Sequence, residues 1–220
     1  KLCFIGNPNV GKSTLINRLL NSNQLQISKH PGTTKKIIEK ELIWNEKEFV
    51  LLDTAGVYRK KNFNFNLLIK ATRFSEIIIL ILDSTIDKLD KIHKKLASHT
   101  LKVGKGLIII INKWDLIKNK KNKKKEIEEF FKNSLPQFKK ENLLFISALR
   151  DENFTKIFKY SVEIKKLLKS TMSTSNLNKW LREITKYNPP IKIRGKEIKF
   201  KYIVQTDTNP PTFKIFSNYP

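Results

Sequence analysis

One stretch constrains the fold of this chain more than any other: residues 6–13, GNPNVGKS, directly after an apolar run. The pattern G-x-x-x-x-G-K-[ST] is typical of a phosphate-binding loop (P-loop), in which backbone N–H groups surround a polyphosphate, Lys12 reaches its terminal phosphates and Ser13 binds Mg²⁺. Such a loop needs a strand before it and a helix after it, because the helix N-terminus completes the anion site. Residues 1–5 predict a buried strand and residues 13–20 have helical spacing. This context favours a phosphate site over a chance Gly/Asn turn.

Near-continuous apolar runs alternate with amphipathic patterns over the first three quarters of the chain. The runs are rich in Ile, as in strands that are buried on both faces of a parallel sheet. These strand candidates are residues 49–52, 77–82, 107–111 and 143–146. The helix candidates, with apolar residues three or four apart, are residues 90–101, 123–132 and 153–168. The alternation predicts a doubly wound α/β domain. Ligands of such sheets bind at the carboxyl ends of the strands, where Asp53, Asn112 and Ser147 follow three of the runs.

The pattern changes after the last of these helices. Residues 169–176, KSTMSTSN, are rich in Ser and Thr and predict a linker. The remaining residues, 177–220, predict part of a small α+β module that does not close a core of its own. Its predicted elements are a helix at 177–187 and strands at 198–204 and 213–216, separated by Pro210 and Pro211.

Two groups of residues are interpreted as structural. Five aromatic residues are predicted to lie in the core of the C-terminal module, in preference to stacking on nucleic-acid bases. They are Trp180, Tyr187, Phe200, Tyr202 and Phe213. The basic run 118–125, KNKKNKKK, is predicted to be a solvated loop. The basic residues between 192 and 201 stay candidates for contacts with RNA phosphates.

The chain is strongly basic, with 44 Lys and Arg against 20 Asp and Glu and a formal net charge of +24. Such a surface favours a polyanionic partner such as RNA, DNA or an anionic membrane face. A compositional bias is the alternative, since 38 of the 44 basic residues are Lys. The single cysteine, Cys3, excludes an internal disulfide and suits a reducing cytosol. No stretch approaches the roughly 20 apolar residues of a membrane span. We therefore expect a cytoplasmic protein with no membrane partner.

Two motifs beyond the P-loop indicate which nucleotide is bound. Asp53-Thr54-Ala55-Gly56 ends the run 49–52, so its carboxylate can meet Mg²⁺ through water and the Gly56 N–H can touch a γ-phosphate. Asn112-Lys113-Trp114-Asp115 follows the run 107–111. Asp115 can accept two hydrogen bonds from guanine, whereas adenine offers no such pair of donors. The sequence therefore favours GTP over ATP.

The neighbours of Asp115 support the same interpretation. Lys113 is predicted to lay its methylenes along the base plane, and Asn112 to tie the loop to the P-loop. Ser147-Ala148-Leu149 fits a supporting loop that contacts the guanine oxygen through a backbone N–H. The alternative for each motif is an ordinary polar turn after a strand, but four such turns in this order and spacing make that alternative remote.

Five motifs together resemble those of the translation-factor-related GTPases: GNPNVGKS, PGTT (31–34), DTAG, NKWD and SAL. Three stretches are similar to the second GTPase domain and C-terminal KH-like domain of the EngA (Der) family: NKWD, LNKWLREITKYNPP (177–190) and PPTFKIFSN (210–218). The resemblance covers nearly the whole chain. It implies a P-loop GTPase domain with a doubly wound sheet (1–168), a linker (169–176) and a truncated α+β KH-like domain (177–220). The chain begins inside a strand, so we expect a segment of a longer protein. The family has two consecutive GTPase domains, so the resemblance implies a preceding GTPase domain.

The resemblance also implies activity, ligands and partners. It implies GTP or GDP with Mg²⁺, hydrolysis of GTP, and a role in late assembly of the large (50S) ribosomal subunit through contact with its rRNA. Catalytic roles fall to Lys12, Thr34 and Gly56, and Mg²⁺ coordination to Ser13, Thr34 and Asp53. In some relatives a K⁺ near the P-loop Asn, here Asn9, supplies positive charge to the transition state. The nucleotide-binding residues that it implies are Gly6, Asn7, Pro8, Asn9, Val10, Gly11, Lys12, Ser13, Thr14, Asp53, Thr54, Ala55, Gly56, Val57, Asn112, Lys113, Trp114, Asp115, Ser147, Ala148 and Leu149.

Val57 stands where Ras-like enzymes carry a water-orienting Gln, so the chain resembles the hydrophobic-substituted class of GTPases. Two stretches depart from the pattern of the family. Lys35-Lys36 stand where the family usually has Arg-Asp. The stretch 57–66, VYRKKNFNFN, is shorter than the family's second switch. Slow intrinsic turnover is expected. Two alternatives stay open: an RNA-binding assembly factor that keeps GTP as a structural ligand, and an Era-like small-subunit or tRNA-modification GTPase.

Overall fold

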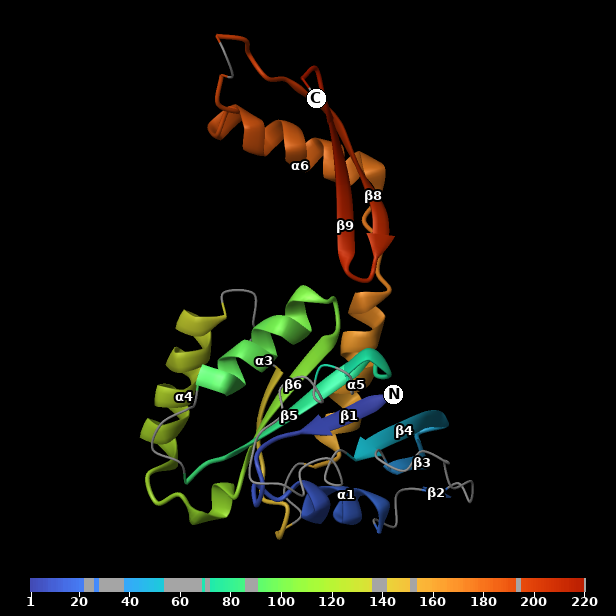
Figure 1. The fold of residues 1–220 in the computed structure, drawn as a ribbon, viewed down its shortest axis with the longest axis vertical. Coiled ribbons are helices and arrows are strands. Elements are labelled where there is room, and N and C mark those ends of the chain that lie inside the picture. The colour runs from blue at the N-terminus through green and yellow to red at the C-terminus, as the bar shows by residue number, and fades with distance from the viewer. Residues whose placement is uncertain are drawn as a thin grey trace. The chain divides into compact units, whose positions relative to one another are not determined.

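The computed structural model describes residues 1–21, 26–27, 38–53, 69, 72–85, 91–135, 142–150, 154–192 and 195–219. The chain forms two compact units, residues 1–165 and residues 166–220 (Figure 1). Among the helices of the described ranges, none has the length and apolar character that a membrane span requires.

The first unit is built on a seven-stranded sheet with the order β2-β3-β4-β1-β5-β6-β7. The strands from β4 to β7 in this order run parallel, which confirms the predicted doubly wound α/β class. The strands are β1 (Leu2–Ile5), β2 (Gln26–Ile27), β3 (Ile38–Trp44), β4 (Lys47–Asp53), β5 (Ile77–Asp83), β6 (Gly106–Asn112) and β7 (Leu143–Phe145). The helices of this unit are α1 (Lys12–Leu20), α3 (Lys91–Lys102), α4 (Lys120–Ser134) and α5 (Lys156–Leu168); the last three residues of α5 fall in the second unit.

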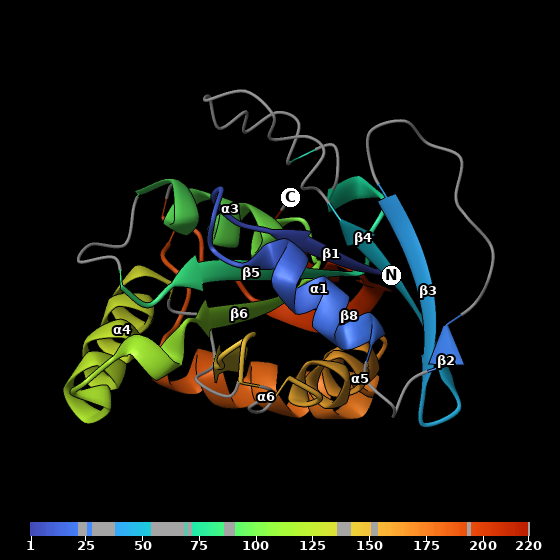
Figure 2. The ribbon, with the colours of Figure 1, turned by 90° about the horizontal axis from the view of Figure 1, so that it is seen from below.

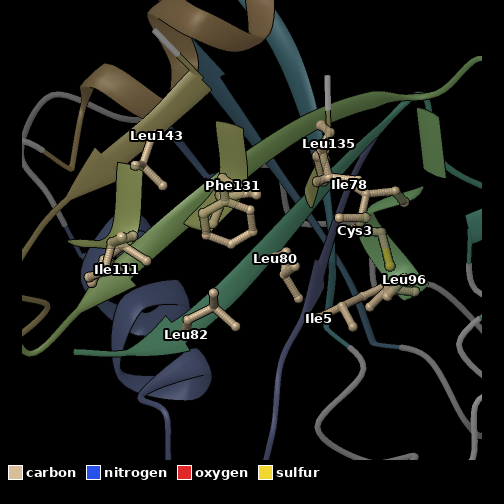
Figure 3. Packing of buried hydrophobic residues seen from close by; sticks show 14 of the residues in the cluster. Cys3, Ile5, Ile78, Leu80, Leu82, Leu96, Ile111, Phe131, Leu135 and Leu143 are labelled. Atoms are coloured by element: carbon tan, nitrogen blue, oxygen red, sulfur yellow. The ribbon is translucent and has the colours of Figure 1, made fainter. Parts of the chain in front are cut away.

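Helices cover both faces of the sheet, so the central strands are apolar on both sides (Figures 1 and 2). All residues of β5 from Ile77 to Leu82 are buried. Alternate residues of these strands pack with Leu96 of α3 and Phe131 of α4 (Figure 3). Fully burying one such side chain contributes about 1.5–3 kcal/mol relative to leaving it exposed, so this core fixes the strand order and with it the loops at the strand ends.

An antiparallel edge extends the sheet beyond the predicted strands. β3 pairs with β4 along its whole length, and β2 pairs with β3. The turn between β3 and β4 consists of Asn45 and Glu46, both with positive φ (47° and 61°), which suits the right-handed twist of a hairpin. On the inner side Phe158 of α5 contacts Trp44 and Phe49, with ring centroids 5.6 and 4.8 Å away. Because β3 carries polar residues in its middle, apolar runs in the sequence do not predict this strand.

The prediction of a solvated loop at 118–125 is wrong, because most of this run is helical. α4 begins at Lys120, and the side chain of Asn119 caps it by accepting a hydrogen bond from Asn122 N. Lysines at this end then meet glutamates one turn further on, as in the 3.1 Å pair of Lys123 with Glu126. Lys is a good helix former, and the spaced pairs offset part of the repulsion within the run.

The second unit contains α6 (Thr174–Tyr187) and the antiparallel hairpin of β8 (Phe200–Thr208) and β9 (Pro211–Ser217). α6 begins inside the predicted linker, because the Ser173 side chain caps it by accepting from Asn176 N. Pro211 is the first residue of β9, a position where a strand tolerates proline. Asn178 of α6 holds the helix to β8 by exchanging two 3.0 Å hydrogen bonds with the backbone of Ile203.

The prediction that five aromatic residues of this unit form its core is wrong. The buried cluster consists of Leu177, Leu181 and Ile203. A single helix on a two-stranded hairpin covers little surface, so large side chains stay between 40% and 79% exposed. The exposed aromatic residues are Trp180, Tyr187, Phe200, Tyr202 and Phe213.

Candidate nucleotide-binding site

The P-loop joins the end of β1 to the start of α1, as the sequence predicts. The path of its backbone requires glycine at two positions, where a Cβ atom would clash with a neighbouring residue. A Cβ at Gly6 would lie 2.3 Å from the carbonyl oxygen of Ile81 in β5. Gly11 has φ +93°, and a Cβ there would lie 2.3 Å from Nδ2 of Asn112. The loop therefore runs close over the sheet and delivers the N-terminus of α1, a natural anion site.

Lys12 is the first residue of α1 and its side chain lies inside the loop. Its ammonium donates to the carbonyl oxygens of Gly6 and Asn7, each at 2.8 Å. Burial lowers the pKa of Lys12 to about 8, and the nearby Asp53 carboxylate opposes that shift. A buried cation held by neutral carbonyls gains free energy when an anion approaches, which suits a phosphate-binding role.

Asp53 ends β4, beside Phe4 of β1, and is buried. Ser13, in the first turn of α1, is exposed. A hydroxyl and a carboxylate are the oxygen donors that Mg²⁺ prefers. The predicted switch threonine Thr34 and the DTAG-Val positions Thr54, Ala55, Gly56 and Val57 lie outside the described residues.

Asn112 ends β6 and joins three loops. Its Nδ2 donates to the carbonyl oxygen of Val10 in the P-loop at 2.7 Å. Its Oδ1 accepts from the backbone N–H of Ala148 at 3.0 Å. The residue is 2% exposed, so both bonds form away from water. The structure thus brings the P-loop, the NKWD loop and the SAL loop together, with Asn112 as the link between them.

An open pocket of about 180 Å³ lies where these three loops meet. Its lining residues are Asn9, Gly11, Thr14, Asn112, Lys113, Asp115, Leu116, Ser147, Ala148 and Leu149. All but Leu116 belong to the predicted nucleotide-binding set. Leu116 directly follows the NKWD motif, so its place in the sequence could have suggested it.

Trp114 belongs to the predicted set but does not line this pocket. The residue is 9% exposed, and its ring lies 4.5 Å from the ring of Phe145, centroid to centroid. Its backbone N–H donates to Ile146 O at 3.0 Å, which ties the NKWD loop to the segment after β7. Trp114 therefore supports the pocket by holding the NKWD loop in place, and does not line the pocket itself.

Asp115 places a carboxylate at the pocket. Its Oδ1 is buried and accepts no hydrogen bond from any of the described residues. A hydrogen bond from the Ser147 side chain holds the pKa of Asp115 below its usual range, helped by the positive charges of Arg150 and Lys120 and opposed by burial. Arg150 Nε lies 3.7 Å from Asp115 Oδ2. The pocket thus holds an ionised acceptor with unused hydrogen-bonding capacity.

Sequence reasoning missed one further contact of the NKWD loop. Lys113 Nζ lies 2.5 Å from Oδ2 of Asp83, the last residue of β5. The sequence signals only that Asp83 ends a strand, because it follows an apolar run in the same way as Asp53 and Asn112 do; it does not signal the pairing with Lys113.

Comparisons with known proteins agree with this geometry. Residues 1–113 match the family described as "50S ribosome-binding GTPase", and residues 171–220 match "KH-domain-like of EngA bacterial GTPase enzymes, C-terminal". The protein named "GTPase Der" of Rickettsia akari is 35% identical over 98% of this chain and 50% of its own length, and that of Rickettsia bellii is 36% identical with the same coverage. The chain spans about half the length of the curated relatives it matches.

A solved structure is also similar over nearly the whole chain. It is Era in complex with MgGDPNP and nucleotides 1506–1542 of 16S ribosomal RNA. The TM-score is 0.57 at 25% sequence identity, and the match covers 98% of this chain and 76% of that one.

Proposed function

Because this chain belongs to the family of 50S ribosome-binding GTPases, we propose that it binds GTP in the pocket between the P-loop, NKWD and SAL loops, and that it hydrolyses GTP to GDP and phosphate. The observation that carries the proposal is the buried Oδ1 of Asp115, which accepts no hydrogen bond from the described part of the chain. Leaving a buried charged acceptor without a partner costs about 1–3 kcal/mol or more, and a ligand with matching donors recovers this free energy.

Guanine supplies these donors. Its N1–H and exocyclic amine can both donate to the Asp115 carboxylate, whereas adenine has no such pair. Lys113 and Ala148 both line the pocket. The lysine methylenes would lie along the base, and the SAL loop, held by the bond from the Ala148 N–H to Asn112, would support it. Leu116 and Leu149 add apolar surface at the mouth.

The phosphates of GTP would lie over the P-loop. Its N–H groups and the Lys12 ammonium would neutralise the β- and γ-phosphates. Ser13 and Asp53 would hold Mg²⁺ together with Thr34, and when bound the ion neutralises charge that develops on the phosphate oxygens. Thr34 and Gly56 are proposed to contact the γ-phosphate. Asn9, whose φ is 65° and which lines the pocket, is proposed to lie near a stimulating K⁺.

We further propose that the GTP cycle serves late assembly of the 50S ribosomal subunit in the cytoplasm, through rRNA. Three findings support a ribosomal partner: the description of the family, the Der relatives, and the net charge of +24. The coverage of half of these relatives supports a preceding GTPase domain. We assign the GTPase domain to residues 1–168 and the KH-like domain to 177–220, joined by a linker.

Two assays test these proposals. Multiple-turnover phosphate release in KCl or NaCl, with and without ribosomal subunits, tests hydrolysis and the role of K⁺. Tight GTP binding without turnover would instead favour the RNA-binding factor with GTP as a structural ligand. Sedimentation with purified subunits tests the partner: we expect retention on 50S subunits with a non-hydrolysable analogue, and retention on 30S subunits would favour an Era-like role.

Asp115→Asn gives a matched control for the guanine contact. Asn keeps the size of the side chain but presents an amide donor to the guanine amine, so GTP affinity should fall about a hundredfold or more. Xanthosine triphosphate carries a carbonyl in place of that amine and should then bind better than GTP. Unchanged GTP affinity in Asp115→Asn would contradict the proposed pocket.

A further inference from the structure

The segment Asp83-Ser84-Thr85, which starts at the last residue of β5, holds the NKWD loop through three contacts. The Ser84 backbone N–H donates to the Asn112 carbonyl oxygen at 2.9 Å. The Ser84 hydroxyl donates to the Lys113 carbonyl oxygen, also at 2.9 Å. Asp83 Oδ2 pairs with the Lys113 ammonium at 2.5 Å. Both the backbone and the side chain of Lys113 are therefore fixed by this segment.

Asp83 is itself held in place. Its Oδ1 accepts from the Thr85 backbone N–H at 2.9 Å and from the Thr85 hydroxyl at 2.7 Å. The Asp83 side chain is 11% exposed and that of Lys113 is 32% exposed. Burial raises the pKa of Asp83, but hydrogen bonds from Lys113 and Thr85 outweigh it, so the pKa lies below its usual value. Asp83 thus presents a fixed, ionised acceptor to Lys113.

Lys113 is a residue for which such an anchor matters. Its backbone lies in the left-handed region, with φ 62° and ψ 31°, where a lysine is strained. Lys113 also lines the pocket. A free lysine side chain samples many rotamers, and a ligand that orders it bears that entropic cost on binding. An ammonium that is already paired leaves the methylenes ordered before a ligand arrives.

We propose that Asp83 is a positioning residue of the base pocket: it anchors the Lys113 ammonium so that the lysine stem forms a preformed wall for guanine. The inference rests on the proposed function, since it concerns the same pocket. Asp83 touches no nucleotide in this scheme and acts only through Lys113.

A double-mutant cycle tests the proposal. The variants Asp83→Ala, Lys113→Ala and the double variant would be made in the whole chain, and their affinity for a fluorescent GDP measured with dissociation rates. In Asp83→Ala the nucleotide must order the Lys113 side chain on binding, and this cost corresponds to a loss of affinity of about three- to tenfold. In the Lys113→Ala background the same substitution should change affinity less than twofold. Asp83→Asn, which keeps an acceptor but loses the charge, should fall between.

Glu126→Ala serves as the matched control. Glu126 also pairs with a lysine, at 3.1 Å, but on the exposed surface of α4, so GDP affinity should stay unchanged. Melting temperatures of all variants separate loss of fold from loss of the anchor, because a purely structural role would give the same loss of affinity with or without Lys113.

The outcomes are distinguishable. Unchanged affinity in Asp83→Ala, or losses that multiply independently in the double variant, would overturn the inference while leaving the proposed function standing. Failure of the unsubstituted chain to bind GDP or GTP at all would overturn both.

Discussion

Replacing Asn112 with Ala should damage the stability of the first unit and the nucleotide pocket together. The side chain makes two buried hydrogen bonds, to Val10 O at 2.7 Å and from Ala148 N at 3.0 Å. Each group that loses its partner costs about 1–3 kcal/mol, so the two together should lower the free energy of unfolding by about 3 kcal/mol. For a unit of this size that corresponds to a fall in Tm of roughly 6–12 °C.

The same substitution should weaken nucleotide binding, because Asn112 connects the P-loop to the SAL loop across the pocket. Without it, the nucleotide must bear the cost of ordering these loops on binding. We expect GDP affinity to fall by at least about tenfold, which corresponds to about 1.4 kcal/mol. Urea unfolding of the nucleotide-free protein and titration with a fluorescent GDP measure the two effects separately.

Asn119→Ala is the control for this substitution. Asn119 is also an Asn that accepts a backbone hydrogen bond, but at the exposed N-cap of α4, where the loss is about 1 kcal/mol. It lies outside the pocket lining, so GDP affinity should not change. If Asn112→Ala destabilises no more than Asn119→Ala and binds GDP normally, then Asn112 does not join the loops as argued.

Three further predictions concern neighbouring residues. Burial lowers the pKa of Lys12 to about 8, and Asp53 opposes this shift. Between about pH 8 and 10 the unfolded chain therefore binds more protons than the folded one, so the free energy of unfolding of the nucleotide-free protein should rise with pH over this range. Urea unfolding measures this gain, and Lys12→Met should remove it. Gly11→Ala should cost about 1–2 kcal/mol for the left-handed backbone alone and displace Asn112, which circular dichroism melts and GDP titration would detect. Burial, with a smaller effect of Asp53, raises the pKa of the Cys3 thiol to about 12, so iodoacetamide at pH 8 should modify Cys3 only in urea, as mass spectrometry would show.

The parallel part of the fold and the loops at its strand ends could be predicted from the sequence, because both leave local signals. β5 and β6 coincide with Ile-rich runs to within one residue at each end, since strands covered by helices on both faces need no polar alternation. The P-loop and NKWD are local patterns whose residues must be of given types at given spacings.

Features that depend on distant partners could not be predicted in this way. β3 carries Glu39, Lys40 and Glu41 in succession, and only pairing with β4 makes it a strand. The aromatic residues of the second unit are of types that often lie in a core, but whether they are buried depends on how much surface the neighbouring elements cover, which no local pattern contains. The contact of Lys113 with Asp83 joins residues thirty positions apart, so no local pattern contains it.

The strand order explains why a single glycine can decide whether this pocket exists. β1 and β6 do not pair; β5 lies between them, and two strand spacings of about 4.8 Å separate the ends that carry the P-loop and Asn112. One Asn side chain cannot span that distance, so the P-loop must cross over the end of β5 to bring Val10 O within 2.7 Å of Asn112 Nδ2. Gly6 makes the crossing possible, because any Cβ there would lie 2.3 Å from Ile81 O of β5. The first glycine of the motif therefore serves the base pocket, through Asn112, as directly as it serves the phosphates.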